Sequence, residues 1–455
     1  MPSTPFDSTA LQDYLDANRH QGRSLLLPAL HKAQSEFGWL PREVLELIGM
    51  NLRVPLADIH GVVEFYSMFY NQPTSTHVVR VCEDPACDLA GAEQLIDRIQ
   101  SATGLAPHQT SPDHRLTFER VPCLGMCDHA PVGLAGEQPA GPIPLDGVDR
   151  FLDGSLPEPK AQKFGSPFWL LQRVGEVDPK SLESYLEHNG YLALNNALGM
   201  RPEELIETIH RAGISGRGGA MFPFGQKLKF TRGAPGNPSE KHIVVNADES
   251  EPGTFKDRVL LEEDPFSIIE SATLAAYAAG AENGWIFVRG EYPKAFRLLE
   301  QAADQARAAG YLGRDILGQP GFNFDIQVRL GAGAYICGEE TALFEAIEGK
   351  RGFPRIKPPF PTTHGLFNQP TAVNNVETLV AGLIVMQHGL NHWLAEGTEA
   401  SPGTKLFCLS GHVKNPGIYE VPFGLTIADL IDLAGGEPHG KDIQAVLMGG
   451  AAGIF

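Results

Sequence analysis

Residues 82–87 read CEDPAC and residues 123–127 read CLGMC, and these two pieces hold four of the six cysteines of the chain. Four residues separate Cys82 from Cys87, three separate Cys123 from Cys127, and 35 lie between the two pairs. Four thiolates can ligate either a [2Fe–2S] cluster or a structural zinc ion. Zinc knuckles mostly use two-residue gaps, so the wider gaps favour an iron–sulfur cluster. Zinc, or buried cysteines without a metal, are the alternatives.

The chain around these cysteines changes its apolar periodicity several times. Residues 7–71 carry the spacing of amphipathic helices, so residues 1–76 are predicted to form a helical bundle. From residue 77 short β-rich runs alternate with a helical segment, which predicts a small α/β domain over residues 77–150. Residues 151–166 are predicted to be a linker because glycine and proline are frequent around them.

The longest segment, residues 167–402, alternates apolar strands with helices, which predicts a parallel sheet covered by helices. Residues 403–455 are β-rich with one helix and predict a small separate module. The sequence stops inside this module, which suggests a partial sequence. With 455 residues and 42% hydrophobic composition, the chain is expected to be an α/β multidomain protein of two to four domains.

Composition excludes several classes of protein. The formal charge of −19 opposes binding to a phosphate backbone, so nucleic acid is not an expected partner. No apolar run is long enough for a direct membrane span, and no leader segment is visible, so a soluble, cytoplasmic protein is expected. Six cysteines are too few for a disulfide framework in a chain of 455 residues. Cys337 and Cys408 are isolated and are predicted to be small buried hydrophobic residues.

Residues 216–227 read GRGGAMFPFGQK, with four glycines and two bases in twelve residues. Glycines let backbone amides approach a phosphate or a flat ring. Three further segments, residues 246–253, 331–340 and 370–377, bring glycines and short polar residues to places where predicted strands end. Ligands of open α/β sheets bind at the carboxyl ends of strands. The dinucleotide fingerprint G-x-G-x-x-G is missing from a strand–turn–helix setting, so an ordinary Rossmann site is not predicted.

The cysteine segments, VRVC at 79–82 and PCLGMC at 122–127, resemble the thioredoxin-like [2Fe–2S] ferredoxin (24-kDa) subunit of respiratory complex I. Residues 60–69 match the helical region that precedes it in that family. The four glycine-containing segments resemble the FMN- and NADH-binding (51-kDa) subunit of complex I and the diaphorase subunits of NAD-linked hydrogenases and formate dehydrogenases. The resemblance implies a helical bundle plus a thioredoxin-like ferredoxin domain, then an α/β FMN-binding domain and a small β-grasp-like module.

The resemblance also implies site residues, with Cys82, Cys87, Cys123 and Cys127 as the cluster ligands. It implies that FMN is surrounded by Gly216, Arg217, Gly218, Gly219, Lys227, Asn246, Asp248, Glu249, Tyr335, Gly338, Glu339, Glu340, Asn374 and Asn375. It implies that NADH is bound by Phe222, Phe230, Glu251, Lys357 and Phe360. Aromatic faces suit adenine and nicotinamide, although the basic run around Lys357 could be an ordinary solvated loop.

The implied chemistry is hydride transfer between NAD(H) and FMN, followed by single-electron transfer to iron–sulfur clusters. Because hydride passes between cofactors, no catalytic side chain is predicted. Glu249 and Glu251 near a ribose would accept its hydroxyls and repel a 2′-phosphate, which predicts NAD over NADP.

The sequence departs from the family pattern at Met221, Phe224 and Leu228, where glycine, threonine and tryptophan are usual, and these changes are expected to reshape the flavin pocket. The family also carries a [4Fe–4S] cluster whose C-x-x-C-x-x-C ligands are absent from this sequence.

Among possible assemblies, the segments CDHAP (127–131) and GLFN (365–368), together with the retention of all four cysteines, favour a formate dehydrogenase. Its molybdenum- or tungsten-containing catalytic subunit is then the expected partner. The alternatives are the same role in a NAD-reducing hydrogenase or in complex I, and a flavin-free electron-relay or assembly subunit.

Overall fold

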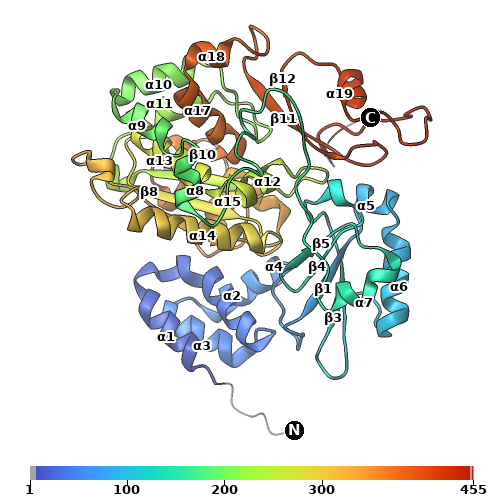
Figure 1. Cartoon of the computed structure of the whole chain (residues 1–455). Coiled ribbons are helices and arrows are strands. Elements are labelled where there is room, and N and C mark those ends of the chain that lie inside the picture. Colours follow the sequence, from blue (N-terminus) through green and yellow to red (C-terminus); the bar gives the residue numbers. More distant parts are fainter. Residues whose placement is uncertain (1–6, 451–452, 454–455) are drawn as a thin grey trace.

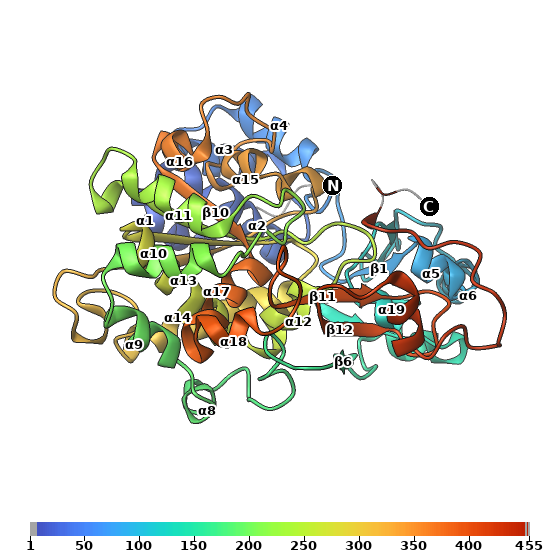
Figure 2. The ribbon, with the colours of Figure 1, turned by 90° about the horizontal axis from the view of Figure 1, so that it is seen from above.

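The computed structural model describes residues 7–450 and residue 453 (Figures 1 and 2). Its first part is a helical bundle of α1 (Thr9–Asn18), α2 (Leu26–Phe37), α3 (Arg42–Leu52) and α4 (Leu56–Phe65), with a 3₁₀ segment over Arg19–Leu25. Gly38 and Arg53 adopt left-handed conformations that end α2 and α3. Within the described part of the chain, no helix is long and apolar enough to cross a membrane.

The second part is a five-stranded sheet in the order β2-β3-β1-β4-β5, in which β1 runs parallel to β3 and antiparallel to β4. Its strands are β1 (Val78–Cys82), β2 (Gln109–Thr110), β3 (Thr117–Val121), β4 (Gly133–Ala135) and β5 (Gln138–Ala140). Its helices are α5 (Pro85–Leu89), α6 (Ala92–Thr103) and α7 (Val148–Leu152), with 3₁₀ turns at Cys127–His129 and Leu145–Gly147. The amphipathic α6 buries Leu95, Ile96 and Ile99 against the sheet.

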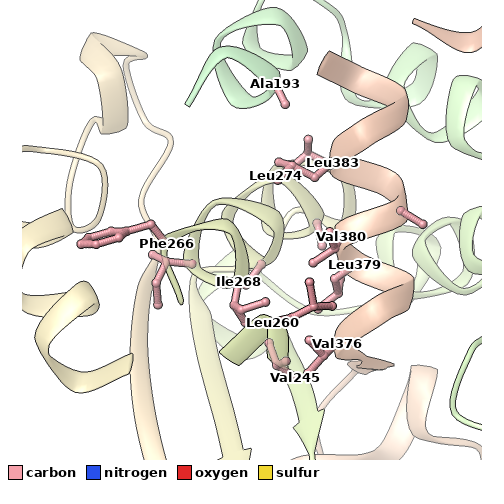
Figure 3. Close-up of a cluster of buried hydrophobic side chains, with 14 of the residues drawn as sticks. Ala193, Val245, Leu260, Phe266, Ile268, Leu274, Val376, Leu379, Val380 and Leu383 are labelled. Carbon is pink, nitrogen blue, oxygen red and sulfur yellow. The ribbon is translucent and has the colours of Figure 1, made fainter. Parts of the chain in front are cut away.

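The third part is built on a four-stranded parallel sheet in the order β10-β7-β8-β9. Its strands are β7 (His242–Ala247), β8 (Asn283–Val288), β9 (Asp325–Leu330) and β10 (Thr371–Asn375). On one face α13 (Pro265–Ala279) and α17 (Val376–His388) form the core, and every residue of α13 except Tyr277 is buried. Figure 3 shows this core, with side chains from β7, α9, α12, α13 and α17 packed together. The prediction of a parallel sheet covered by helices is confirmed.

The second face of this sheet is covered by the N-terminal bundle (Figure 1). Side chains alternate along a strand, so Ile243 and Val245 of β7 face the α13–α17 core, whereas Val244 faces the other way. Val244 packs in one hydrophobic cluster with bundle residues such as Leu27 and Leu30. The bundle is therefore the second helical layer of the α/β domain.

The remaining helices of the third part lie around these layers. They are α8 (Leu182–Glu187), α9 (Leu192–Leu198), α10 (Pro202–Arg211), α11 (Phe224–Gly233), α12 (Lys256–Glu263), α14 (Pro293–Ala308), α15 (Glu340–Ile347), α16 (Pro361–His364) and α18 (Leu390–Leu394). Short 3₁₀ turns occur at Pro238–Glu240, Ile316–Gly318, Tyr335–Gly338 and Leu366–Asn368.

The C-terminal module contains β11 (Thr404–Leu409), β12 (Gly417–Pro422) and α19 (Ile427–Leu433). Its third strand, β6 (Lys163–Gly165), comes from the segment predicted to be a linker and pairs in parallel with β12. Glu420 of β12 also binds the segment that follows β6. Its carboxylate accepts the backbone N–H groups of Trp169, Leu170 and Leu171 at 2.8–3.0 Å. The chain between the second and third parts is thus bound into the C-terminal sheet.

Candidate functional site

The four clustered cysteines meet at one end of the five-stranded sheet. Cys82 ends β1, Cys87 lies in α5, Cys123 follows β3, and Cys127 begins a 3₁₀ turn. All four are buried, and the sulfur atoms of Cys123 and Cys127 lie 3.3 Å apart. Hydrogen bonding from Cys127 and Cys82 lowers the pKa of Cys123. The two pairs lie at the same end of the sheet because β1, which ends at Cys82, runs parallel to β3, which ends just before Cys123.

The four buried thiols and the backbone amide of Gly125 suit a [2Fe–2S] cluster. A [2Fe–2S] cluster takes two thiolates at each of two irons, which matches two pairs of cysteines. The backbone N–H of Gly125 donates to the sulfur of Cys123 at 3.3 Å, the kind of hydrogen bond that stabilises thiolates in iron–sulfur proteins.

The glycine-rich loop precedes α11 and folds back on itself, with the N–H of Gly216 bonded to the carbonyl of Phe222 at 3.0 Å. A Cβ atom on Gly218 would lie 3.2 Å from the Cβ of Asn375, so this glycine allows the loop to approach the end of β10. Gly219 has a φ of +101°, a conformation that side chains disfavour. The loop therefore presents backbone to the carboxyl edge of the sheet.

Polar residues meet at that edge because β7 and β10 are adjacent parallel strands, with Asn246 paired to Asn375. The ammonium of Lys227 donates to the carbonyl of Val373 at 2.6 Å, and the amide of Asn246 donates to the carbonyl of Gly338 at 2.8 Å. Burial lowers the pKa of Lys227. The predicted residues of all four segments are thus brought together.

One buried donor at this edge fits a polar ligand. The side-chain nitrogen of Asn374 is buried and, within the described residues, has no hydrogen-bond partner. Such a group costs about 1–3 kcal/mol unless a bound molecule accepts its hydrogen. Nearby, burial raises the pKa of Asp248 to about 7. The glycine amides, Lys227 and Asn374 together fit the phosphate and polyol chain of FMN, which present many acceptors.

Two of the residues predicted for NADH are aromatic, with Phe222 on the glycine-rich loop and Phe230 on α11. The rings of Phe222 and Phe230 are exposed and lie 6.3 Å apart, centroid to centroid. Lys357 is paired with Glu339 at 2.9 Å and with Glu340 at 2.7 Å, and Tyr335 donates to the carboxylate of Glu251.

Phe360 is also exposed. Elsewhere in the basic run, Lys350 and Arg355 are paired with Glu345 and Glu348, so much of its charge is balanced.

Two residues assigned to FMN by resemblance have other partners in the structure. Arg217 is buried and its guanidinium bonds to Glu377 and to the carbonyl of Thr404. Both carboxylate oxygens of Glu249 accept backbone N–H groups at the start of α12, from Asp257 at 2.8 Å and Arg258 at 2.9 Å. Burial raises the pKa of Glu249 to about 8.

The departures from the family pattern divide into two kinds. Phe224 and Leu228 are buried in the core, and Phe224 packs against Gly382 of α17, so they do not line the pocket. Met221 is exposed and has a φ of +54°, the left-handed region that favours glycine. This conformation explains why glycine is usual at that position.

Sequence reasoning missed the residues that hold the glycine segment 331–338 in place. His31, Met68 and Ser67 of the bundle region bond to the backbone of Gly331, Ala332 and Gly333 at 2.7–3.0 Å. Burial lowers the pKa of His31 to about 4, so it is neutral near pH 7. The contacts join residues 264 to 300 positions apart in sequence, and no local pattern marks them.

Comparison with known families and proteins agrees with this architecture. Residues 11–154 match the thioredoxin-like [2Fe–2S] ferredoxin family, residues 209–381 the Nuo51 FMN-binding domain, and residues 406–450 the SLBB domain. The alpha subunit of the NAD-reducing hydrogenase HoxS of Cupriavidus necator is 36% identical over 447 residues, covering 95% of this chain and 72% of that subunit.

A second relative, a subunit of the NADH-quinone oxidoreductase of Rhizobium meliloti, is 47% identical over 285 residues, covering 62% of this chain and 67% of that protein. The crystal structure of an air-oxidised NAD⁺-reducing [NiFe]-hydrogenase superposes with a TM-score of 0.77 at 32% identity, covering 91% of this chain and 70% of that one. This chain therefore belongs to the family of NADH-oxidising electron-transfer (diaphorase) subunits that join a 24-kDa-type thioredoxin-like [2Fe–2S] ferredoxin to a 51-kDa-type FMN-binding domain in one polypeptide.

Proposed function

We propose that the chain binds FMN at the carboxyl edge of β7 and β10 and NADH beside Phe222, Phe230, Glu251, Lys357 and Phe360. The observation that carries this proposal is the convergence of four sequence segments on one edge, where the amide nitrogen of Asn374 is buried without a partner among the described residues. Bound FMN would exchange two electrons with a nicotinamide and one electron at a time with an iron–sulfur cluster.

The protein side chains bind and orient, and none is proposed to move a proton. Lys227 supplies a positive charge in the pocket, and the glycine amides supply donors without the bulk of side chains. Lys357, held by Glu339 and Glu340, lies at the mouth of the site, where a cation suits the pyrophosphate of a dinucleotide. Glu251 favours NAD over NADP because a carboxylate accepts ribose hydroxyls and repels a 2′-phosphate.

For the larger assembly, a hydrogenase-type complex has more support than a formate dehydrogenase. The similarity to a NAD-reducing hydrogenase subunit spans 95% of this chain. A formate dehydrogenase remains the second candidate, because all four cysteines of the ferredoxin domain are present. Metal analysis of the co-purified complex separates the two: nickel supports the hydrogenase, whereas molybdenum or tungsten supports the formate dehydrogenase.

The direct test is the optical spectrum of the purified chain before and after anaerobic addition of NADH, with acid-released FMN and iron measured on the same sample. About one FMN and two irons per chain, with bleaching of the flavin band by NADH, are expected from the two cofactor domains. Iron without flavin would overturn the proposal and leave a flavin-free electron relay.

A further inference from the structure

The ferredoxin domain contacts the FMN-binding domain through the loop from Cys123 to Cys127. These two cysteines pack in the hydrophobic core of the FMN-binding domain, whereas Cys82 and Cys87 pack in a separate cluster of the ferredoxin domain. One half of the ligand set is therefore surrounded by residues of the other domain.

Two buried arginines of the FMN-binding domain donate to this loop. Arg289, which follows β8, donates from Nη2 to the carbonyl oxygen of Cys123 at 2.7 Å. Arg258, in α12, donates from Nε to the carbonyl oxygen of Gly125 at 2.7 Å. Each arginine is only 4% exposed, so its charge is weakly screened by solvent.

The loop is closely fitted to this surface. A Cβ atom on Gly125 would lie 1.9 Å from the hydroxyl oxygen of Tyr292, and Gly125 itself has a φ of +67°. The same loop directs the N–H of Gly125 to the sulfur of Cys123. By fixing the carbonyl groups, the arginines also fix the orientation of the neighbouring amides.

Each arginine has carboxylates near it, and they differ in accessibility. Glu291 pairs with Arg289 at 3.0 Å and is 17% exposed. Arg258 lies 3.4 Å from Glu262 and 3.6 Å from Asp128. Carboxylates also lie at the loop, since Asp84 accepts the N–H of Cys123 at 2.8 Å and Asp128 directly follows Cys127. The two guanidinium groups are the cations that donate to the carbonyl groups of the loop from the FMN-binding domain.

We propose that Arg258 and Arg289 raise the reduction potential of the [2Fe–2S] cluster, so that the FMN-binding domain itself makes the cluster a better electron acceptor. Reduction adds one negative charge to the cluster, and a fixed positive charge nearby stabilises the reduced form more than the oxidised form. Hydrogen bonds that orient amides toward the sulfurs act in the same direction. The inference rests on the proposed electron-transfer function and assigns a role within it to two positioning residues.

The test is a redox titration of the full chain, with its flavin and iron content measured, in which the paramagnetic signal of the reduced cluster is followed by electron paramagnetic resonance. We expect Arg289→Gln and Arg258→Gln to lower the midpoint potential by at least about 59 mV, a tenfold change in the one-electron equilibrium. Arg289→Lys keeps the charge and is expected to shift the potential less than Arg289→Gln.

Two further variants distinguish an effect of the arginine charges on the potential from an effect of lost structural contacts. Glu291→Gln removes the counter-charge of Arg289 and is expected to shift the potential upward, opposite to Arg289→Gln. Arg297→Gln is the matched control, because Arg297 pairs with Glu137 across the same interface but its side chain is 51% exposed. Its potential is expected to equal that of the wild type.

The outcomes are distinguishable. If the arginine variants keep the cluster and their potentials match the wild type and Arg297→Gln, the inference is overturned. If the arginine variants lose the cluster, the midpoint potential of Glu291→Gln becomes the test. A potential in Glu291→Gln that is not higher than that of the wild type then overturns the inference. If the dithionite-reduced wild type shows no paramagnetic signal of a cluster, the proposed electron-transfer function itself is overturned.

Discussion

Arg217 donates from Nη1 to Oε1 of Glu377 at 3.0 Å, and both side chains are almost completely buried. Glu377 also lies 3.1 Å from the ammonium of Lys256 and accepts the backbone N–H of Leu406 at 3.0 Å. The guanidinium of Arg217 further stacks on the ring of Phe423 at 4.9 Å. This one carboxylate therefore joins the glycine-rich loop, α12 and the C-terminal module.

Replacing Glu377 by glutamine is predicted to destabilise the protein by about 3–5 kcal/mol, because it leaves buried cations without their counter-charge. The apparent midpoint of thermal unfolding, measured at one scan rate, is expected to fall well below that of the wild type. Glu399→Gln, on the exposed surface, is the control and should leave the midpoint unchanged. An unchanged midpoint for Glu377→Gln would show that the buried pair contributes little.

The same carboxylate predicts a pH dependence. Burial alone would raise the pKa of Glu377, but Lys256, Lys405 and Arg217 outweigh burial and lower it to about 2. A lowered folded-state pKa stabilises the fold above the unfolded value, and this contribution is lost as the pH falls through the folded value. The stability difference between wild type and Glu377→Gln should therefore shrink between about pH 4.5 and pH 2. A difference independent of pH in this window would contradict the assignment.

Cys123→Ser is predicted to remove the cluster while leaving the flavin. Serine is a poor ligand for iron, so iron should fall from about two atoms per chain toward none. FMN content should be retained, since the residues proposed to bind the flavin lie on other segments. Cys408→Ser is the control, because Cys408 lies on β11 of the C-terminal module, outside the two cysteine segments, and accepts a hydrogen bond from the N–H of Phe255. Equal iron in wild type and Cys123→Ser would show that this cysteine is not a ligand.

Lys357→Ala is predicted to raise the KM for NADH roughly tenfold, about 1.4 kcal/mol of binding, with a smaller effect on kcat. The expectation follows from its place at the mouth of the proposed site, against Glu339 and Glu340. Lys350→Ala is the matched control, since Lys350 belongs to the same basic run but pairs with Glu345 and Glu348. Equal KM values for the two variants would assign Lys357 to an ordinary surface loop.

The sequence predicted the grouping of the four cysteines and of the glycine-containing segments because both depend on local signals. Cysteine spacing marks the ligand loops, and parallel pairing of β1 with β3 brings Cys82 near Cys123. Glycines mark places where backbone must approach a ligand. Both signals can be recognised in a single sequence.

What could not be predicted depends on long-range packing. The resemblance implies that Arg217 lies at the FMN site, but no local pattern indicates its buried partner Glu377, which lies 160 residues away. The periodicity of residues 7–71 predicts a helical bundle but does not show what the bundle packs against. In the structure its apolar side chains also pack against Val244 of the parallel sheet. Arg258 lies shortly after the glycine-containing segment 246–253, and Arg289 directly follows the strand β8. Neither position indicates from sequence alone that the side chain contacts the cysteine loop.

Glu251→Gln is predicted to weaken the preference for NADH over NADPH. A carboxylate beside the adenosine ribose repels a 2′-phosphate, so removing its charge should lower the ratio of kcat/KM for NADH to that for NADPH by about tenfold. Glu251 is suited to this role because it is partly exposed at the edge of the site, next to Tyr335, whereas Glu249 is buried against α12. Glu187→Gln, a distant exposed carboxylate, should leave the ratio unchanged. A wild type with a lower KM for NADPH than for NADH would overturn the predicted preference, and an unchanged ratio in Glu251→Gln would assign discrimination to another residue.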